Sequence, residues 1–474
     1  MRNKSGDLEI ITIETPSLGD RSYIAIVEHV AIAIDPQRDT DRIEEILVRR
    51  GATLHAVLET HFHNDYITGG LALARTTGAE YVVPTGPALG FDATRLEDDQ
   101  QLRIGPMEIR VLDSAGHTDA HRTYEVRHVG AKVGVAFTGG SLLIGGTGRT
   151  DLLGAHRAEE LARKQYHSVR RIGETLPPAT LLYPTHGFGS FCSAGPVVGG
   201  GATLTEQLRG NPAFTLSEES FVTSVLSRLG AYPRYFNLMG PRNIGFPAPA
   251  DLSPLRRLTL EDAAALANGG RSKLVDVRPR AESAAGHVAK SLCIDGSGAL
   301  ASWFGWIASI DQPIGIIAQS INEASAAQRE LQRIGVDFIV GAHIADQVLV
   351  QTSKVAPIVS TPRASFADLA VRIQRDPEIV IIDVREDDER ADSYIEGSIH
   401  IPAHKLPTAD LSTLKGREIW THCGAGFRSA IAASLLERRG LRSTIVDDRF
   451  FVAREAGLPI HLGSHIAANA ATAR

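Results

Sequence analysis

A histidine-rich turn directly after an apolar run is the feature that most constrains how this chain can fold. Residues 54–58 read as a buried strand, and His61, His63 and Asp65 follow it in the turn Thr-His-Phe-His-Asn-Asp-Tyr. Histidine is the commonest metal-binding side chain, and two imidazoles from one tight loop can share an ion. We therefore expect this turn to hold a metal ion, with an ordinary polar turn as the alternative.

Two further histidines stand at the ends of strand-like runs, each beside a glycine. His117 follows the run 107–112, and His186 follows the run 179–182. Glycine lets the backbone turn sharply, so each imidazole would be presented at a strand end. These motifs in this order, with Gly-Arg-Thr-Asp-Leu at 148–152, resemble the metallo-β-lactamase superfamily. They resemble in particular its branch of glyoxalase II-like hydrolases and iron-dependent persulfide dioxygenases, which implies an αββα sandwich.

The chain departs from the pattern of that superfamily at two positions. Tyr66 stands where the family motif HxHxDH has its last histidine. Gly140 stands where the family has an aspartate that ligates iron or bridges two zinc ions. A dinuclear zinc hydrolase needs both missing side chains, so the resemblance favours a mononuclear site.

The surviving ligand residues divide between two sites in that family pattern. We expect His61, His63 and His117 to form a site of three imidazoles, while Asp65 and His186 remain from the second site. Open-sided nitrogen and oxygen sites suit non-haem iron, and three histidines with an open position also suit zinc. The expected cofactor is Fe²⁺, with Zn²⁺ as the alternative. Asp65 could bind the ion or orient a histidine, and a metal-free domain that keeps only the fold is the remaining alternative.

A cysteine loop near the C-terminus is the second candidate reactive centre. Cys423 follows the strand-like run 418–422 and is followed by Gly424, Gly426 and Arg428. The helix N-terminus expected after this loop and the arginine both favour a thiolate, whereas a buried structural thiol is the alternative. The four residues between cysteine and arginine resemble the rhodanese sulfurtransferase loop, since related phosphatases have one residue more. Cys423 and Arg428 are thus the expected catalytic residues, and Gly424 and Gly426 are expected to surround the bound sulfur.

An internal repeat precedes this loop, and its first copy lacks the reactive residues. Residues 274–278 align with 381–385 at an offset of 107, which falls to 105 further along. At that offset Ala318 stands opposite the cysteine and Glu323 opposite the arginine. We expect this copy to keep the fold as a spacer or docking surface, with Cys293 in its core.

Two further residues are candidates for contact with substrate. Arg149 could anchor a carboxylate or sulfonate through a bidentate contact, or form a structural ion pair with Asp151. Cys192, six positions after His186, could relay sulfur at the mouth of the metal site or be a packed loop thiol. We expect Tyr66 to pack.

Length, charge and cysteine content bound the remaining possibilities. The 474 residues allow three domains, which we place at 1–245 (metal-binding), 255–350 (inactive rhodanese-like) and 362–465 (rhodanese). A net charge of −6 argues against nucleic acid as a partner, and no run of about 18 apolar residues exists for a membrane span. Three cysteines make no disulfide framework, and the start of the chain has no secretory signal. We expect a cytoplasmic homo-oligomer.

The order of the domains points to a function in sulfur chemistry. A metallo-β-lactamase domain, a silent rhodanese copy and an intact one resemble bacterial fusion proteins of persulfide detoxification. The resemblance implies that a low-molecular-weight thiol persulfide is oxidised to sulfite at the metal. It also implies that Cys423 carries sulfane sulfur to an acceptor, such as sulfite to give thiosulfate. The alternatives are a zinc thioester hydrolase of the glyoxalase II type, and a sulfurtransferase with a non-catalytic metallo-β-lactamase scaffold.

Overall fold

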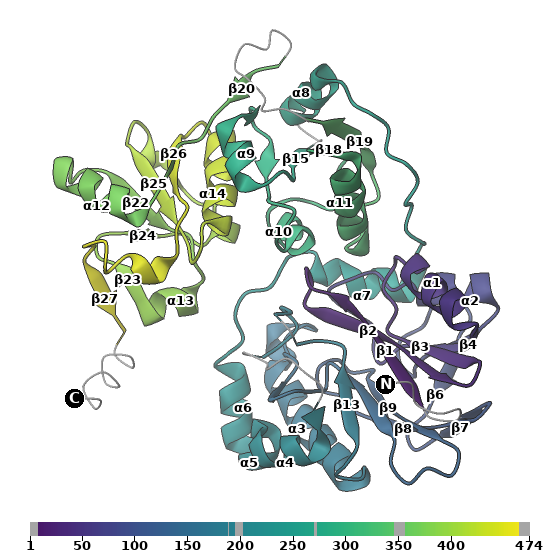
Figure 1. Cartoon of the computed structure of the whole chain (residues 1–474). Helices are drawn as coiled ribbons and strands as arrows, with labels where there is room; N and C mark the ends of the chain where they lie inside the picture. Colours follow the sequence, from purple (N-terminus) through teal and green to yellow (C-terminus); the bar gives the residue numbers. More distant parts are fainter. Residues whose placement is uncertain (1–7, 188, 195–201, 270–272, 346–355, 464–474) are drawn as a thin grey trace. The chain divides into compact units, whose positions relative to one another are not determined.

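Mixed β-sheets and helices form two units in the computed structural model (Figure 1). The structure describes residues 8–187, 189–194, 202–269, 273–345 and 356–463. The first unit contains the chain up to Asp251 together with Gln332–Gly335, and the second contains the rest. None of the described helices combines the length and apolar character needed to cross a membrane.

The first unit is built on two six-stranded sheets. In spatial order the first sheet contains β1 (Glu9–Thr15), β2 (Asp20–Val27), β3 (Val30–Ile34), β4 (Thr53–Leu58), β5 (Glu80–Pro84) and β6 (Thr94–Leu96). The second contains β14 (Ala202–Thr203), β13 (Leu181–Pro184), β10 (Val135–Gly139), β9 (Arg122–His128), β8 (Met107–Asp113) and β7 (Gln101–Ile104). A short hairpin adds β11 (Leu142–Leu143) and β12 (Gly146–Thr147). The strand-like runs predicted from the sequence therefore fall on β4, β8 and β13.

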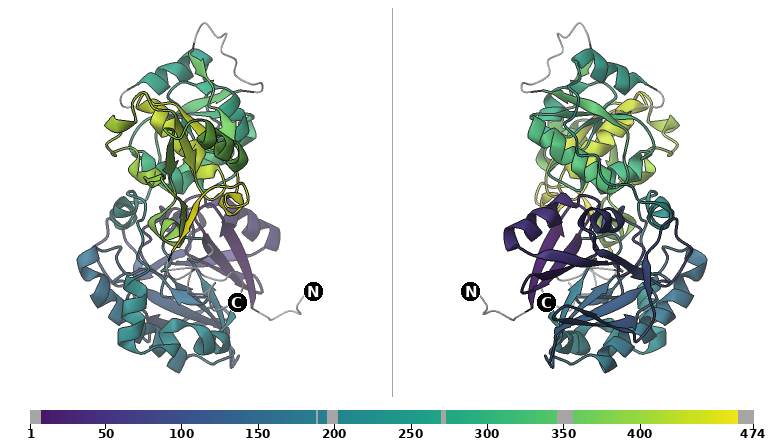
Figure 2. Two further views of the ribbon diagram at one scale, coloured as in Figure 1. Left: turned by 90° about the vertical axis from the view of Figure 1, so that its left-hand side faces the viewer. Right: turned by 90° about the vertical axis from the view of Figure 1, so that its right-hand side faces the viewer.

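Helices cover the outer faces of both sheets (Figures 1 and 2). They are α1 (Asp41–Arg50), α2 (Gly70–Thr77), α3 (Ala158–Thr175), α4 (Leu204–Gly210), α5 (Pro212–Thr215) and α6 (Glu218–Leu226). The remaining helix, α7 (Phe236–Gly245), contacts the histidine-rich turn through Asn243. Leu58 and Phe137 belong to the core between the sheets, Leu47 of α1 to the core outside the first sheet, and Val169 and Phe221 to the core outside the second. These three apolar layers are those of the expected αββα sandwich.

The ends of two helices in this unit follow from local backbone conformation. Helix α1 begins at Asp41, and it ends where Gly51 adopts a left-handed conformation with φ of 59°. Ile43 and Leu47, four residues apart on one face, are its buried side chains. A 3₁₀ turn at Ala155–Arg157 precedes α3, which therefore begins at Ala158. Turns of this kind are common at helix ends.

The second unit contains two smaller sheets whose strand pairings are parallel. The first contains, in order, β17 (Leu292–Cys293), β15 (Lys273–Asp276), β18 (Ile314–Ala318) and β19 (Ile339–Ile344). The second contains β21 (Arg363–Ala364), β26 (Ser443–Val446), β25 (Ile419–His422), β22 (Val380–Asp383) and β24 (Ile399–His400). Two short antiparallel pairs are β16 (His287–Val288) with β20 (Ile358–Val359), and β23 (Ser393–Ile395) with β27 (Ile460–Leu462). Parallel sheets of this kind carry their ligand sites at the carboxyl ends of strands.

Seven helices flank these sheets in the described part of the second unit. They are α8 (Leu260–Asn268), α9 (Arg280–Ala285), α10 (Leu300–Ile307), α11 (Ile321–Arg333), α12 (Phe366–Arg375), α13 (Asp387–Asp392) and α14 (Phe427–Arg438). Short 3₁₀ turns lie at Ala403–Lys405, Ser412–Leu414 and Phe450–Val452.

The predicted internal repeat has the same ion pair in both copies. Arg278 donates from Nη2 to Asp276 at 2.6 Å, and Arg385 donates to Asp383 at 2.7 Å. Each guanidinium also donates to a backbone oxygen eight residues along, at 2.7 Å and 2.6 Å. All four side chains are buried, and a buried pair is tolerated when its donors and acceptors are satisfied. The sequence match at an offset of 107 thus reflects one structural frame used twice.

Candidate metal centre and cysteine loop

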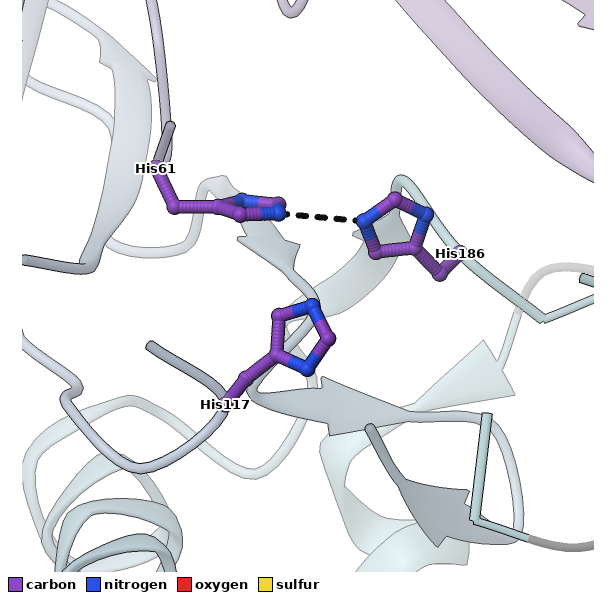
Figure 3. Close-up of side chains that lie close together, drawn as sticks. All are labelled: His61, His117 and His186. Carbon is purple, nitrogen blue, oxygen red and sulfur yellow. Dashed lines mark hydrogen bonds between the residues drawn. The ribbon is translucent and has the colours of Figure 1, made fainter. Parts of the chain in front are cut away.

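Three loops at strand ends bring His61, His117 and His186 together (Figure 3). His61 follows β4, His117 lies between β8 and β9, and His186 follows β13. Each imidazole is buried, and one nitrogen of each lies within 4.8 Å of the others. The histidines come from both sheets, so the αββα sandwich itself builds the cluster.

In His117 and His186, the outer ring nitrogen, Nδ1, has a hydrogen-bond partner outside the three-histidine cluster. The inner nitrogen, Nε2, therefore points toward the centre of the cluster. His117 donates from Nδ1 to the backbone oxygen of Arg149 at 2.8 Å, and Nδ1 of His186 faces Oδ1 of Asp20 at 2.8 Å. The Nε2 atoms of His186 and His61 lie 3.1 Å apart, and Nε2 of His117 has no hydrogen-bond partner among the described residues. Such second contacts fix the tautomer of a metal-binding histidine. These convergent nitrogens fit a single metal ion.

Burial and mutual proximity govern the protonation of the cluster. Burial and the neighbouring imidazoles lower the pKa of His117 to about 3 and that of His61 well below its usual value. Burial also opposes the charge on His186, but the carboxylates of Asp65 and Asp20 outweigh it and raise its pKa to about 10. Two imidazoles are therefore neutral, the form that binds metal, and the third lies against carboxylates.

The imidazole of His117 occupies the space beside Gly140, where the family carries its aspartate. A Cβ atom at position 140 would lie 2.2 Å from Cδ2 of His117. A Cβ at Gly148, on the other side, would lie 2.6 Å from Nδ1 of the same ring. The two glycines thus let the ring lie directly against the backbone. Because the ring of His117 fills the space beside position 140, an aspartate side chain would not fit there.

His63 contacts a different set of groups from the one predicted. Its Nε2 atom lies 3.0 Å from the hydroxyl of Tyr66, 3.2 Å from Oε2 of Glu59 and 3.3 Å from Oδ1 of Asp35. Burial opposes its charge, but these carboxylates raise the pKa of His63 to about 9. The structure groups His61 and His117 with His186 rather than with His63, and the expected ligand set of His61, His63 and His117 stays a prediction. Tyr66 packs on the His63 ring, with centroids 4.3 Å apart.

Asp65 lies beside the cluster, in a second group with His63 and His186. Its Oδ2 atom is 3.3 Å from Nδ1 of His186, and neither oxygen has a well-oriented hydrogen bond among the described residues. Burial is the largest single effect and raises its pKa, but His186 and His63 together outweigh burial and lower the pKa. The carboxylate can thus bind an ion or orient His186, the two roles expected from the sequence.

Asp35 connects the loops, although the sequence analysis did not select it. It follows β3 with a φ of 50°, and its Oδ1 accepts the backbone N–H of Thr60 at 2.6 Å. Its Oδ2 accepts the hydroxyls of Thr60, at 2.7 Å, and Thr185. One carboxylate thereby fixes the loops that carry His61 and His186. The available signal was an aspartate directly after a buried apolar strand.

Arg149 forms the ion pair with Asp151 that the sequence left open, and a substrate contact stays a prediction. Its guanidinium forms a bidentate pair with Asp151 at 2.7 Å and 2.8 Å. It also donates to the backbone oxygens of Phe191 and Gly230, at 3.1 Å and 2.6 Å, and lies over the ring of Tyr232. All of these contacts are with other residues of the first unit, so the guanidinium forms the ion pair with Asp151 that was the alternative to a substrate contact.

Cys192 lies next to the metal cluster but is fully buried. Burial and the carboxylates of Asp65 and Asp20 raise the pKa of its thiol well above the usual value. The thiol is the less nucleophilic form. A sulfur relay through Cys192 stays a prediction, and its surroundings favour the packed thiol.

The predicted cysteine loop links β25 to α14 in the second unit. Cys423 follows directly after β25 and is 2% exposed. Gly426 precedes α14 with a φ of 85°, and a Cβ atom there would lie 2.0 Å from Oδ1 of Asp447. Only glycine adopts this conformation without strain. The loop thereby places the sulfur at the N-terminus of α14, as expected for a rhodanese cradle.

Arg428 has a partner, Glu389, that lies far from it in the sequence. Its Nη2 donates to Oε1 of Glu389 at 2.7 Å, and Nη1 bonds to the other carboxylate oxygen. Burial opposes ionisation of Glu389, but Arg428 lowers its pKa. A Cβ at Gly424 would lie 3.4 Å from the arginine, so the guanidinium lies alongside the loop. The acidic run at 386–389 was the available signal.

The first rhodanese-like copy has a different loop at the same position. Ile317 of β18 pairs with Asp276 of β15, as His422 of β25 pairs with Asp383 of β22. Ala318 therefore takes the place of Cys423. Glu323 accepts the backbone N–H of residue 319 at 2.6 Å, so a carboxylate closes this loop. The cysteine of this copy, at position 293, is buried in the core as predicted.

Comparison with known proteins agrees with this architecture. Residues 259–342 and 366–450 match the family model of the rhodanese-like domain. A crystal structure of a metallo-beta-lactamase from Staphylococcus aureus subsp. aureus COL matches with a TM-score of 0.64 and 24% identity, covering 71% of this chain and 99% of that chain. The fold and its sites define a metallo-β-lactamase-fold protein that carries rhodanese-like domains, which confirms the predicted fold class.

Proteins related in sequence show to which family within this class the chain belongs. Persulfide dioxygenase ETHE1 of Homo sapiens is 32% identical over 237 residues, which are 50% of this chain and 81% of the relative. The hydroxyacylglutathione hydrolase-like protein of Mus musculus is 32% identical over 173 residues, 35% of this chain and 56% of the relative. The chain belongs to the family of persulfide dioxygenase ETHE1. It is an enzyme of sulfur metabolism, as expected from the sequence.

Proposed function

We propose that the first unit oxidises a low-molecular-weight persulfide to sulfite at a mononuclear metal site, and that Cys423 transfers sulfane sulfur as a cysteine persulfide. The convergence of the inner nitrogens of His61, His117 and His186 carries this proposal. Membership of the persulfide dioxygenase family supports the substrate class. The homo-oligomeric state and the cytoplasmic location stay predictions.

The three imidazoles would hold Fe²⁺, with Zn²⁺ as the alternative. A bound ferrous ion would supply open coordination positions and the redox chemistry that O₂ requires. Asp20 keeps Nδ1 of His186 engaged, so that Nε2 faces the cluster. Burial of all three rings excludes water from the site, which strengthens electrostatic interactions with an anionic persulfide.

The proposed oxidation is RSSH + O₂ + H₂O → RSH + SO₃²⁻ + 2H⁺. The sulfur–sulfur bond of the persulfide breaks, and the terminal sulfur loses four electrons to O₂. The proton that leaves the persulfide on binding has an acceptor beside the site in Asp20, whose pKa is raised by burial to about 8.

The proposed transfer at Cys423 needs no oxidant. Its thiolate attacks the terminal sulfur of a persulfide or thiosulfate, a new sulfur–sulfur bond forms, and a thiolate or sulfite leaves. Sulfite can then remove the sulfur as thiosulfate, which regenerates the cysteine. Covalent storage divides one transfer into two easier steps. A single chain also raises the effective concentration of intermediates if the sites can reach each other.

Metal analysis of matched variants tests the proposed ligands without any activity assay. We expect His117→Ala and His186→Ala to weaken metal binding by about 100-fold or more, because each removes an inner nitrogen. His63→Ala should retain the metal, since His63 contacts Glu59 and Tyr66 instead. His55→Ala, an exposed histidine on β4, is the control. Metal loss in His63→Ala with retention in His186→Ala would contradict the proposed grouping.

Oxygen uptake by as-purified protein tests the chemistry. Iron in the protein with O₂ consumption and sulfite release from glutathione persulfide supports the proposal. Zinc as the only activating ion, with turnover of S-lactoylglutathione, would favour the thioester hydrolase. A metal-free first unit beside a working Cys423 would favour the non-catalytic scaffold.

A further inference from the structure

Residues of the first rhodanese-like copy extend to the cysteine loop of the second copy at two successive positions, Gly426 and Phe427. Both copies belong to the second unit, and helix α9 of the first lies beside α14 of the second (Figure 1). Gly426 and Phe427 come directly before Arg428, so they set the path of the loop between the nucleophile and its arginine. Contacts at these two residues can therefore alter the reactive site from outside it.

Asp447 transmits the first of these contacts, since a Cβ atom at Gly426 would lie 2.0 Å from its Oδ1. Arg280 of the first copy donates from Nε to the same oxygen at 2.8 Å. Arg363 of the second copy donates from Nε to the other oxygen, Oδ2, at 2.9 Å. Burial opposes the charge on Asp447, but Arg280 and Arg363 outweigh burial and lower its pKa. An arginine of the first copy thus fixes the carboxylate oxygen that lies against the loop.

The second contact, at Phe427, is direct. A Cβ atom at Gly298 of the first copy would lie 2.3 Å from Cε2 of Phe427, so the ring lies against the backbone there. Trp303 of α10 meets the same ring edge-on, with centroids 6.5 Å apart and an angle of 66° between the rings. Close packing of this kind leaves no room for a side chain at position 298. The position of the Phe427 ring, and of the loop backbone that carries it, thus depends on the first copy.

A single turn of the first copy holds both contacting residues. Oδ2 of the buried Asp295 accepts the backbone N–H of Arg280 at 3.1 Å, and the backbone oxygen of Asp295 accepts the N–H of Gly298 at 3.2 Å. Its Oδ1 accepts the backbone N–H and the hydroxyl of Ser297, at 3.0 Å and 2.6 Å. The turn is built from residues of the first copy alone, so this copy presents Arg280 and Gly298 together.

We propose that the first copy, which lacks a cysteine in its own loop, positions the loop of Cys423 through Arg280 and Gly298 for sulfur transfer. The inference rests on the proposed transfer at Cys423, since it assigns positioning residues to the same site. Backbone amides at the start of a helix stabilise a thiolate, and they stay aligned only while Gly426 and Phe427 keep their places. A displacement of about 1 Å at such a site can lower the rate by about 10²-fold.

Arg280→Gln tests the contact through Asp447. We expect kcat for transfer from thiosulfate to cyanide to fall about tenfold with less than about a twofold change in KM, because the loop rather than substrate binding is disturbed. Arg280→Lys keeps a charged donor and should restore kcat to within about threefold of the parent value. Glu437→Gln removes another ion pair between the copies, with His287, and should leave kcat unchanged. An unchanged kcat in Arg280→Gln, or an equal loss in Glu437→Gln, would overturn the inference.

Gly298→Ala tests the contact with Phe427 without a change of charge. The added methyl group would displace the ring, and we expect kcat to fall about fivefold. Gly296→Ala in the same segment would place its Cβ 3.0 Å from the backbone oxygen of Val277, within the first copy, and should leave kcat unchanged. Equal effects of the two alanines would count against a positioning role for Gly298.

Alkylation of Cys423 by iodoacetamide separates failure of this inference from failure of the proposed transfer. The reaction requires only the thiolate, and Cys423→Ser gives the background from the two other cysteines. We expect Arg280→Gln to slow alkylation about fivefold at neutral pH. Slower alkylation in this variant, with no transfer even in the parent protein, would reject the transfer and leave the positioning role standing. Transfer in the parent protein, with alkylation and kcat both unchanged in Arg280→Gln, would reject the positioning role alone.

Discussion

The two rhodanese-like copies share buried contacts in their cores and differ in the loop that follows one strand. Both bury the same aspartate–arginine pair below parallel strands, with matching hydrogen bonds. The active copy then has Cys423-Gly-Ala-Gly-Phe-Arg, and the silent copy has Ala318-Gln-Ser-Ile-Asn-Glu. The fold is thus maintained by buried contacts that do not involve the reacting atoms. The proposed sulfur transfer depends on six residues at the carboxyl end of one strand, where parallel α/β folds place their ligand sites.

Replacing the nucleophile tests this separation with the largest expected effect. Cys423→Ser should lower sulfur transfer from thiosulfate to cyanide by about 10³-fold or more, because the persulfide cannot form. Cys293→Ser, in the core of the silent copy, should keep most of the transfer activity. Transfer that persists in Cys423→Ser and disappears in Cys293→Ser would reverse the assignment of the two copies.

Substitutions in the loop of the first copy test why this copy is expected to be inactive. Either the missing cysteine and arginine or the shape of the loop would prevent sulfur transfer. In a Cys423→Ser protein, adding Ala318→Cys and Glu323→Arg should not raise the rate of sulfur transfer, because the loop of the first copy lacks both glycines. Adding Gln319→Gly and Ile321→Gly should raise transfer about tenfold above that background. The assay is again thiosulfate to cyanide. Activity in the double variant alone would show that loop shape is not the barrier.

Filling the tightest glycine of the active loop should have a smaller effect. Gly426→Ala combines the positive φ with a Cβ 2.0 Å from Asp447, and should cost about 2–3 kcal/mol of unfolding free energy. Gly440→Ala has a similar φ of 77° with nothing within 4 Å, so about 1 kcal/mol is expected. Urea unfolding of both variants measures the difference. Equal losses would mean that the contact with Asp447 adds nothing.

Local spacing was enough to identify candidate residues for the two sites, but not how the structure groups them. The strand-end histidines and the cysteine loop follow from strands, glycines and a helix start that lie next to them in sequence. The choice of His186 over His63 depends on ring orientation, which is set by Asp20, Asp35 and Glu59. These carboxylates come from other strand ends, and no local pattern connects them to the histidines. The fold class was therefore predictable, whereas the composition of the metal cluster needed the tertiary structure.

The ion pair of His287 and Glu437 joins the two rhodanese-like copies. Its removal should cause the smallest loss of unfolding free energy among these predictions, and the loss should depend on pH. His287 is buried, and its Nε2 lies 2.8 Å from Oε2 of Glu437, whose Oε1 accepts the backbone N–H of Lys290. Burial opposes both charges, yet the pair raises the pKa of His287 and lowers that of Glu437. Asp276 reinforces the histidine's shift and Arg442 the glutamate's.

The direction of these pKa shifts fixes the pH range in which the pair stabilises the fold. The contribution of His287 is complete below its unfolded pKa of about 6.5 and is lost as pH rises through the folded value. The contribution of Glu437 is complete above about 4.5 and is lost as pH falls. Glu437→Gln should therefore cost about 1 kcal/mol of unfolding free energy between these limits and less in alkaline solution. Glu455→Gln, at an exposed position, controls for the lost charge. If urea unfolding showed the same loss in acid and in alkali, the contact between the copies would not depend on the charged pair.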